Sequence, residues 1–142
     1  MQRFDSVTRE LPVAYEQAFG FIAEPKNLPK WALAFRAADE QSALIVQASR
    51  DVPVRIASRT VSSRESGVID WHMAMPDGSE IRALSRLVDL LNGNCVYTFL
   101  FFARPVADAD IAGTLAGQKR AVEQEFDNLI AQLGGVGDES CS

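Results

Sequence analysis

The order of two sequence patterns constrains the fold of this chain more than any single residue does. Short strand-like segments separated by turn residues are followed by one long segment whose apolar residues recur at helical spacing. The apolar residues of that last segment are Ile111, Leu115, Val122, Phe126, Leu129 and Leu133. A helix with such a stripe must bury it against another element, and the preceding strands supply the surface. The sequence therefore predicts an α+β fold, in which a curved antiparallel sheet wraps around a long C-terminal helix.

The first part of the chain predicts one strand and two short helices. Residues 4–9 alternate between apolar and polar side chains, as a half-buried strand does, and this strand is expected to end near Glu10. Pro12 suits the first turn of a helix, and Gly20 is expected to interrupt or bend that helix. Pro25 and Pro29 leave room for only a second short helical segment before Trp31.

The middle of the chain predicts a series of antiparallel strands joined by tight turns. Apolar residues recur there at a period of two, and the segments between them contain the Pro, Gly, Asn and Asp residues that turns favour. The predicted strands are residues 44–48, 52–58, 68–75, 80–88 and 95–103, and the predicted turns lie near Arg50–Asp51, at Pro76–Asp77–Gly78 and at Asn92–Gly93.

One register of the hairpin around Pro76–Asp77–Gly78 keeps similar residues on each face of the sheet. With Met75 opposite Ser79, one face of the hairpin is apolar and the other is largely charged. The apolar face then pairs Met73 with Ile81, Trp71 with Ala83 and Ile69 with Ser85, and the charged face pairs His72 with Arg82, Ala74 with Glu80 and Val68 with Arg86.

The last hairpin and the last helix carry three further expectations. Two turn geometries are open at Asn92–Gly93, and we favour the one that turns Phe99 and Phe101 inward. Asp108 or Asp110 is expected to cap the helix. Gly134–Gly135 is expected to end it, which predicts a single domain over residues 1–134 and a disordered tail over residues 135–142.

Composition argues against several classes of protein. The formal net charge of -5 and the pI near 4.8 oppose nucleic-acid binding. The longest nearly apolar stretch, residues 95–103, is about half of the ~20 residues that a membrane-spanning helix needs. The N-terminus lacks the apolar core of a secretory signal, so a cytoplasmic location is expected. Cys95 and Cys141 lack metal-ligand spacing and are expected to be free thiols, and neither a metal nor a cofactor is predicted.

The order of elements is similar to the helix-grip pattern of the START-like (SRPBCC) superfamily, which includes polyketide cyclases, lipid-transfer domains and the pollen-allergen fold. Three stretches carry the likeness: residues 18–31, which end in Trp31, then Gly67–Trp71 with Pro76–Asp77–Gly78, and finally Gln124–Leu133. The resemblance implies a cavity between the sheet and the last helix that holds an apolar compound. It implies no shared catalytic residues.

The favoured hypothesis is a carrier or sensor that binds a hydrophobic or amphipathic small molecule, such as a lipid or a polyketide-like compound. Gly113 and Gly117 weaken the first turns of the last helix, which predicts a gate for ligand entry there. The predicted cavity wall consists of Val54, Ile56, Trp71, Met73, Ile81, Ala83, Phe99, Phe101, Val122 and Phe126.

Two alternative functions remain open. One is an enzyme of the cyclase or dehydratase type, whose candidate proton-transfer groups are His72, Asp70, Arg82 and Ser85. The plainer interpretation of His72, the single histidine, is an exposed strand residue beside Arg82. The other alternative is an interaction module or homodimer that uses Leu84 and the outward aromatic residues of the last hairpin.

Two pairs of arginines lie four residues apart, and so on one face of their predicted strands, namely Arg55 with Arg59 and Arg82 with Arg86. Such pairs are typical of a strand face that is exposed to solvent. An arginine at the mouth of the cavity would instead bind a ligand carboxylate.

Overall fold

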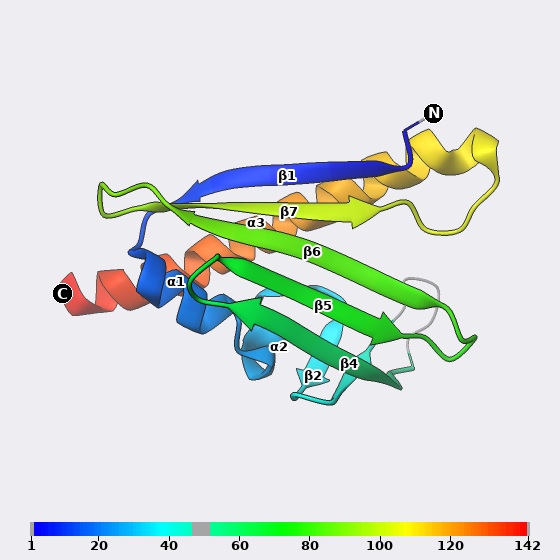
Figure 1. Cartoon of the computed structure of the whole chain (residues 1–142), viewed down its shortest axis with the longest axis horizontal. Coiled ribbons are helices and arrows are strands. Elements are labelled where there is room, and N and C mark those ends of the chain that lie inside the picture. Colours follow the sequence, from blue (N-terminus) through cyan, green and yellow to red (C-terminus); the bar gives the residue numbers. More distant parts are fainter. Residues whose placement is uncertain (1, 47–51, 142) are drawn as a thin grey trace.

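Within the described residues, seven antiparallel strands form one curved sheet, and the long C-terminal helix lies along one of its faces (Figure 1). The computed structural model describes residues 2–46 and 52–141, with side chains through residue 134. The strands are β1 (Phe4–Leu11), β2 (Phe35–Ala38), β3 (Ser42–Ile45), β4 (Val54–Ser63), β5 (Val68–Ala74), β6 (Glu80–Asp89) and β7 (Cys95–Phe102). The helices are α1 (Tyr15–Ile22), η1 (Pro25–Asn27), α2 (Leu28–Trp31), η2 (Asp108–Asp110) and α3 (Ile111–Cys141).

The strand order is β1-β7-β6-β5-β4-β3-β2, so the first strand pairs with the last. The helices α1 and α2 carry the chain from β1 at one edge of the sheet to β2 at the other. We call the face of the sheet that packs against α3 the inner face and the opposite one the outer face. The architecture confirms the predicted sheet, long helix and short helices.

The hairpin of β5 and β6 has the predicted register. Trp71 lies opposite Ala83 and His72 lies opposite Arg82. The turn is fixed by Asp77, whose carboxylate accepts the backbone N–H of Ser79 at 2.9 Å, and by Gly78, whose positive φ of 89° an L side chain rarely adopts. The inner face of this hairpin therefore carries Trp71 and its apolar neighbours.

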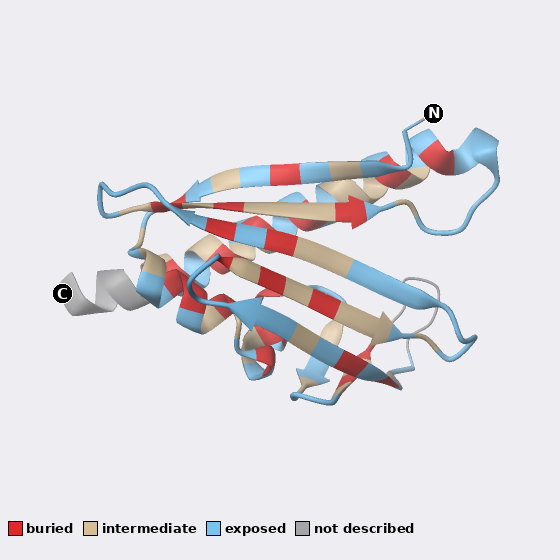
Figure 2. Cartoon of the chain, viewed as in Figure 1, coloured by how far each residue is buried: buried red, intermediate tan, exposed pale blue. Residues whose placement is uncertain are grey.

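The hairpin of β6 and β7 turns Phe99 and Phe101 to the inner face, as predicted. The Phe99 ring lies 6.2 Å from that of Trp71 and 6.5 Å from that of Phe126, and Phe101 is buried. Phe102 lies on the outer face with 38% of its surface exposed. Figure 2 shows the resulting alternation of buried and exposed residues along the strands.

The region before β4 differs from its prediction in detail. The sequence did not separate β2, a four-residue strand with an irregular register between Phe35 and Ala37, because a segment this short has little periodicity. In β3, Ala43 and Ile45 are buried, while Leu44 faces the other side. The predicted turn near Arg50–Asp51 lies outside the described residues.

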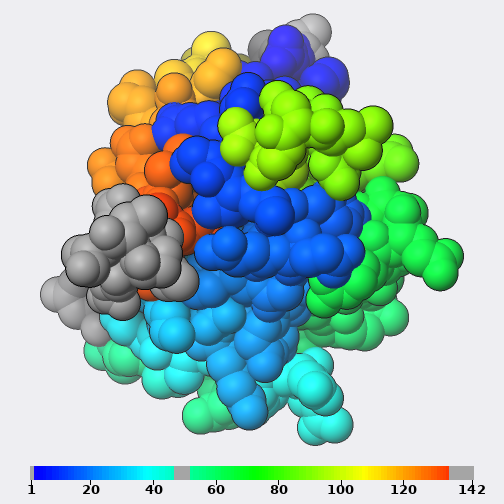
Figure 3. All heavy atoms as spheres, turned by 90° about the vertical axis from the view of Figure 1, so that its left-hand side faces the viewer, coloured from blue at the N-terminus to red at the C-terminus, as the bar shows by residue number. Residues whose placement is uncertain are grey.

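The helix α1 begins at Tyr15 rather than at Pro12, because Ala14 still has extended backbone angles. It runs through Gly20 without a break. The end of the molecule that α1 covers is seen in Figure 3, where α1 and the turn between β6 and β7 lie side by side. Two hydrogen bonds hold this end, from the Cys95 thiol to the Val13 carbonyl at 3.4 Å and from the Tyr15 hydroxyl to the Arg64 carbonyl at 2.7 Å.

The apolar stripe of α3 is buried against the inner face at all six predicted positions. Arg9 on β1 pairs with Asp127 on α3, and Lys119 lies 3.8 Å from Asp5, so charged pairs flank the stripe along the edge strand. The candidate capping residues lie in η2, directly before α3, and Asp108 accepts a hydrogen bond from Arg3 at 3.0 Å.

The end of α3 also differs from its prediction. The helix continues past Gly134–Gly135 to Cys141, because glycine is permitted in a helix although it lowers the stability there. The side chains of residues 135–142 lie outside the described part of the chain, so the disorder predicted for this tail stays a prediction.

Candidate functional site

A small cavity lies between the inner face of the sheet, α2 and α3. Its volume is about 50 Å³. For comparison, an engineered apolar cavity of about 150 Å³ binds benzene, whereas a single water needs about 10–15 Å³. The cavity therefore has room for a few waters, and a drug-sized molecule would need a larger one. Its lining residues are Leu28, Trp31, Ala32, Phe35, Trp71, Met73, Ala83, Phe99 and Glu125.

Aromatic side chains occupy most of the space between the sheet and α3. The ring centroids of Trp31 and Trp71 are 6.1 Å apart, and those of Tyr97 and Phe126 are 5.2 Å apart. Phe99 packs against Trp71 at 6.2 Å with an interplanar angle of 35°. These separations are typical of attractive aromatic pairs, so the cluster is a packed core with a small unfilled volume at one side.

The two tryptophans that line the cavity each have a buried indole nitrogen without a hydrogen-bond partner among the described residues. Trp31 is 3% exposed and Trp71 is 2% exposed. Neither Nε1 has a hydrogen-bond acceptor within the described residues. A buried donor left unpaired destabilises the folded state by about 1–3 kcal/mol, so two such donors in neighbouring side chains are unusual in a protein core.

The cavity contains one ionisable group, the carboxyl group of Glu125 on α3. Its Oε2 accepts the backbone N–H of Leu33 at 2.8 Å. Burial raises the pKa of Glu125 to about 7, and the hydrogen bond from Leu33 opposes that shift only in part. None of the nine lining residues is a Lys, Arg or His. A carboxyl group that titrates near neutral pH inside a cavity is able to accept or donate a proton there.

Ser85, one of the predicted catalytic candidates, lies on the inner face and belongs to a closed hydrogen-bond chain. The Tyr97 hydroxyl donates to Ser85 Oγ at 2.8 Å, and the Ser85 hydroxyl donates to the Ile69 carbonyl. Full burial raises the pKa of Tyr97. Both hydroxyl protons are therefore used in holding the β5–β6–β7 region together.

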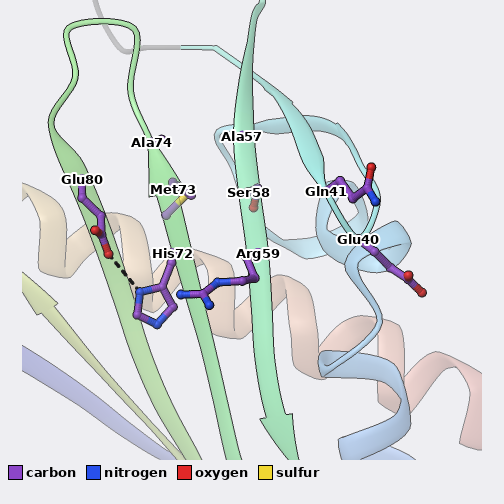
Figure 4. Close-up of a pocket in the computed structure, with 9 residues that line it drawn as sticks. All are labelled: Glu40, Gln41, Ala57, Ser58, Arg59, His72, Met73, Ala74 and Glu80. Atoms are coloured by element: carbon purple, nitrogen blue, oxygen red, sulfur yellow. Dashed lines mark hydrogen bonds and ion pairs between the residues drawn. The ribbon is translucent and has the colours of Figure 1, made fainter.

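The other three catalytic candidates lie on the outer face, across the sheet from the cavity. His72 Nδ1 lies 3.0 Å from Glu80 Oε1, an interaction that lowers the pKa of Glu80 (Figure 4). Asp70 accepts the backbone N–H of Ser85 at 3.1 Å. The Arg82 guanidinium lies 5.0 Å above the Phe102 ring. The alternation of side chains along a strand separates these groups from Ser85 and from the cavity.

His72 also lines a second hollow, an open groove of about 400 Å³ on the outer face. In Figure 4, the side chains of Arg59, His72 and Glu80 extend on the same side of their strands. Small side chains, Ala57 and Ala74, lie opposite each other on β4 and β5 between these longer ones. The full lining is Glu40, Gln41, Ala57, Ser58, Arg59, His72, Met73, Ala74 and Glu80.

Four of the ten residues predicted to line a ligand cavity line this small cavity, namely Trp71, Met73, Ala83 and Phe99, and their contact with a ligand stays a prediction. Three others, Phe101, Val122 and Phe126, are buried in the main core. Val54 and Ile56 belong to a separate apolar cluster with Ala43 and Ile45 at the β3–β4 end of the sheet. Ile81 is 40% exposed and lies near the turn of the β5–β6 hairpin, where it pairs with Met73.

Five lining residues were not predicted: Leu28, Trp31, Ala32, Phe35 and Glu125. Four of them come from the segment that runs from α2 to the first residue of β2, and its position over the sheet depends on tertiary packing. Glu125 lies between the stripe residues Val122 and Phe126 on α3. A carboxylate so close to two positions expected to be buried was the sequence signal that could have identified it. Glu125 lies eight residues, or about 12 Å, beyond Gly117. The cavity is therefore not adjacent to the predicted gate at Gly113 and Gly117.

The outer face combines arginines with apolar side chains. Arg59, His72 and Arg82 lie in one row across β4, β5 and β6. Leu84 and Leu100 lie opposite each other in the next row, and both are partly buried. Arg59 and Arg82 are exposed, as predicted for arginines on a strand face that contacts solvent. A homodimer through this face stays a prediction.

No protein-family model matches the sequence, and no curated protein matches it either. Solved structures do match. A START superfamily protein from Mycobacterium smegmatis has a TM-score of 0.70 and 10% identity, over 93% of this chain and 99% of that one. The Zhui aromatase/cyclase from Streptomyces sp. R1128 has a TM-score of 0.66 and 11% identity, over 93% of each chain. The di-domain ARO/CYC BexL has a TM-score of 0.61 and 19% identity, over 93% of this chain and 45% of that one.

The chain therefore has the START-like helix-grip fold, as the order of its elements predicted. At identities of 10–19% these structures establish the fold alone. Among the described residues, no helix is both long and apolar enough to span a bilayer, and no group of three or more His, Cys, Asp or Glu is arranged to hold a metal ion.

Proposed function

We propose that the chain binds a hydrophobic or amphipathic small molecule in the cavity between the inner face of the sheet and α3, as a carrier or a sensor. The composition of the cavity wall carries this proposal. The wall is mostly aromatic and aliphatic, with one carboxyl group, that of Glu125, among the apolar side chains. Sites for small organic molecules have this mixture of apolar surface and few polar groups.

Binding of such a molecule requires the cavity of about 50 Å³ to enlarge. The segment best able to move is α2, a helix of four residues that lies between the sheet and α3. Two hydrogen bonds tie its end to α3, from Leu33 N–H to Glu125 at 2.8 Å and from Asn128 Nδ2 to the Trp31 carbonyl at 3.4 Å. Displacement of α2 would open the cavity without breaking any strand pairing. Met73 has the side-chain flexibility to adapt to a ligand.

The test is native mass spectrometry of the purified protein, followed by thermal unfolding with a panel of fatty acids, sterols and aromatic polyketide-like compounds. A ligand that binds only the folded chain raises the melting temperature. Ala83→Leu should remove this effect, because the added methyl groups occupy the cavity. A panel without a single stabilising compound would contradict the proposal.

Ala74→Leu is the matched control. Ala74 lies on the neighbouring strand but faces the outer groove. The same substitution there should leave ligand binding in the inner cavity unchanged. Loss of binding in Ala74→Leu with retention in Ala83→Leu would assign the ligand to the outer groove and refute the inner site.

A second candidate function is a cyclase or dehydratase. For such an enzyme, Glu125 is a better placed proton-transfer group than the candidates chosen from the sequence. Its pKa of about 7 suits proton transfer inside the cavity, whereas His72 and Arg82 face away from it. Incubation with a linear poly-β-ketone thioester, followed by mass spectrometry, tests this function. Turnover by the wild type that is lost in Glu125→Gln would support it, and equal turnover by both proteins would exclude Glu125 from the reaction.

A further inference from the structure

We propose that the ligand of the inner cavity carries a protonated amine, which pairs with the carboxylate of Glu125. This inference rests on the proposed function and specifies the chemical class of the ligand.

The carboxyl group of Glu125 has one oxygen available to a ligand. Its Oε2 accepts the backbone N–H of Leu33 at 2.8 Å, whereas its Oε1 has no hydrogen-bond partner within the described residues. In that part of the chain, the buried side-chain atoms without a partner are the two indole nitrogens, and Oε1 is not one of them, so it is accessible. A carboxylate has about four lone-pair sites on its two oxygens, and Glu125 therefore has room to accept an N–H group from a ligand.

The charge of Glu125 has no counter-charge in the cavity. It is the one ionisable residue of the wall, and the wall has no Lys, Arg or His. Glu125 also takes part in no ion pair among the residues that the structure describes. Burial of a carboxylate without a counter-charge is unfavourable, which is why burial raises the pKa of Glu125. A cationic ligand would supply the counter-charge, whereas a carboxylate or phosphate ligand would add a second negative charge.

The rest of the wall favours an organic cation. Four of the nine lining residues are aromatic, among them Trp31 and Trp71, whose ring centroids lie 6.1 Å apart. Aromatic rings attract ammonium groups, and this attraction offsets part of the loss of water around the charge. Leu28, Met73 and Ala83 present further apolar surface, against which a hydrocarbon ring or chain would pack. The cavity therefore suits an amphipathic amine better than a fatty acid, an organic phosphate or a pure hydrocarbon.

The test compares four probes of similar shape: cyclohexylammonium, cyclohexanol, methylcyclohexane and cyclohexanecarboxylate. Each is titrated at pH 8 into the ¹⁵N-labelled wild-type protein and into Met73→Ala, in which the cavity is larger. An aliphatic amine with a pKa of about 10.4, like that of lysine, stays protonated at this pH. Shifts of the backbone amide resonances give the dissociation constants. The Leu33 amide is the local reporter, because its N–H donates to Glu125.

Cyclohexylammonium should shift the Leu33 amide and bind about tenfold or more tightly than each of the other probes. Glu125→Gln keeps an acceptor for Leu33 without the charge. This variant should lose about tenfold or more of the affinity for cyclohexylammonium and should bind cyclohexanecarboxylate more tightly than the wild type does. Glu123→Gln is the matched control, because Glu123 lies on the same helix and is exposed, and it should bind all probes as the wild type does.

The affinity of the wild type for cyclohexylammonium should also rise about tenfold between pH 6 and pH 8, because the pKa of Glu125 is about 7 and the ionised form binds the amine. No other titratable side chain lines the cavity from α2, from the strands or from α3. Tyr97 on β7 is near enough for the charge of Glu125 to affect it, but burial raises the pKa of Tyr97, so it stays protonated over this range. Glu125→Gln should show no such rise.

Two kinds of result would overturn the inference, and they have different meanings for the proposed function. The pairing with Glu125 is refuted, while an apolar site is kept, if cyclohexylammonium binds no more tightly than cyclohexanol, leaves the Leu33 amide unshifted, or binds equally well to Glu125→Gln. Failure of all four probes to bind either the wild type or Met73→Ala refutes the ligand site as well.

Discussion

Replacing Glu125 by glutamine should make the stability of the protein less dependent on pH. Burial raises the pKa of this carboxyl group from 4.5 to about 7 in the folded chain. Folding therefore favours the protonated form, and the stability that this preference contributes is complete below pH 4.5 and is lost as the pH rises through 7. Glutamine keeps an oxygen that accepts the N–H of Leu33 and does not ionise.

The magnitude follows from the two pKa values. At about 1.4 kcal/mol per pH unit, the ionisation of Glu125 should lower the free energy of unfolding by about 2 kcal/mol between pH 5.5 and pH 8.5. The assay is urea denaturation at both pH values for the wild type and for Glu125→Gln. Other groups titrate in both proteins and cancel in the difference. The stability of Glu125→Gln relative to wild type should increase by about 2 kcal/mol from the lower to the higher pH.

Glu123→Gln is the control, since Glu123 lies two residues earlier on α3 and is exposed. Its stability relative to wild type should change by less than about 0.5 kcal/mol over the same pH range. If Glu125→Gln behaves like Glu123→Gln, then the carboxyl group is ionised at neutral pH in the folded chain. The argument for a proton-transfer group in the cavity would then fail.

Three further predictions concern the fold. Gly117→Ala should raise the free energy of unfolding by about 0.5–1 kcal/mol, because the residue is inside α3 and a Cβ has space there. Gly67→Ala should instead lower the free energy of unfolding by about 2 kcal/mol or more. The φ of Gly67 is +79°, and a Cβ there would lie 2.0 Å from a backbone oxygen. Urea denaturation measures both, and similar effects of the two substitutions would contradict the backbone geometry. Ser85→Ala removes the acceptor of the buried Tyr97 hydroxyl and should lower the free energy of unfolding by about 1–3 kcal/mol. Tyr97→Phe should lower it less, because Ser85 keeps its hydrogen bond to the Ile69 carbonyl. A larger loss in Tyr97→Phe than in Ser85→Ala would contradict this hydrogen-bond chain. Burial raises the pKa of the Cys95 thiol to about 11, so peptide mapping should find Cys95 unmodified by iodoacetamide at pH 8 until urea unfolds the protein, and rapid native labelling would show that β7 is accessible.

The sheet and its registers were predictable because local sequence decides them. The β5–β6 register follows from the turn at Asp77–Gly78 and from the need to keep Trp71 with Ala83 on one face. The burial of the α3 stripe follows from its spacing alone. In these elements, turn chemistry and periodicity agree with each other, so one register satisfies both.

The cavity was predictable only in part, since its position depends on contacts between distant segments. The strand residues Trp71 and Ala83 were assigned correctly from the face on which they lie. Trp31 and Glu125 reach the same cavity through the packing of α2 against α3, which no periodic pattern encodes. The catalytic candidates illustrate the same limit, because Asp70 and His72 share a strand face that lies away from the cavity.

The pairing of β1 with β7 has a consequence for how the chain folds. Phe4 pairs with Phe102 and Leu11 with Cys95, so the first strand has no partner until nearly the whole sheet has been synthesised. Such distant pairing slows folding, because a long loop must close before any contact compensates for it. During synthesis, β1 and the unpaired edge of β6 would be exposed to other chains, a state that favours aggregation and chaperone binding. A slow folding phase that becomes faster in a circular permutant, in which the linked termini place β1 after α3 and so closer to β7 along the chain, would reveal this step.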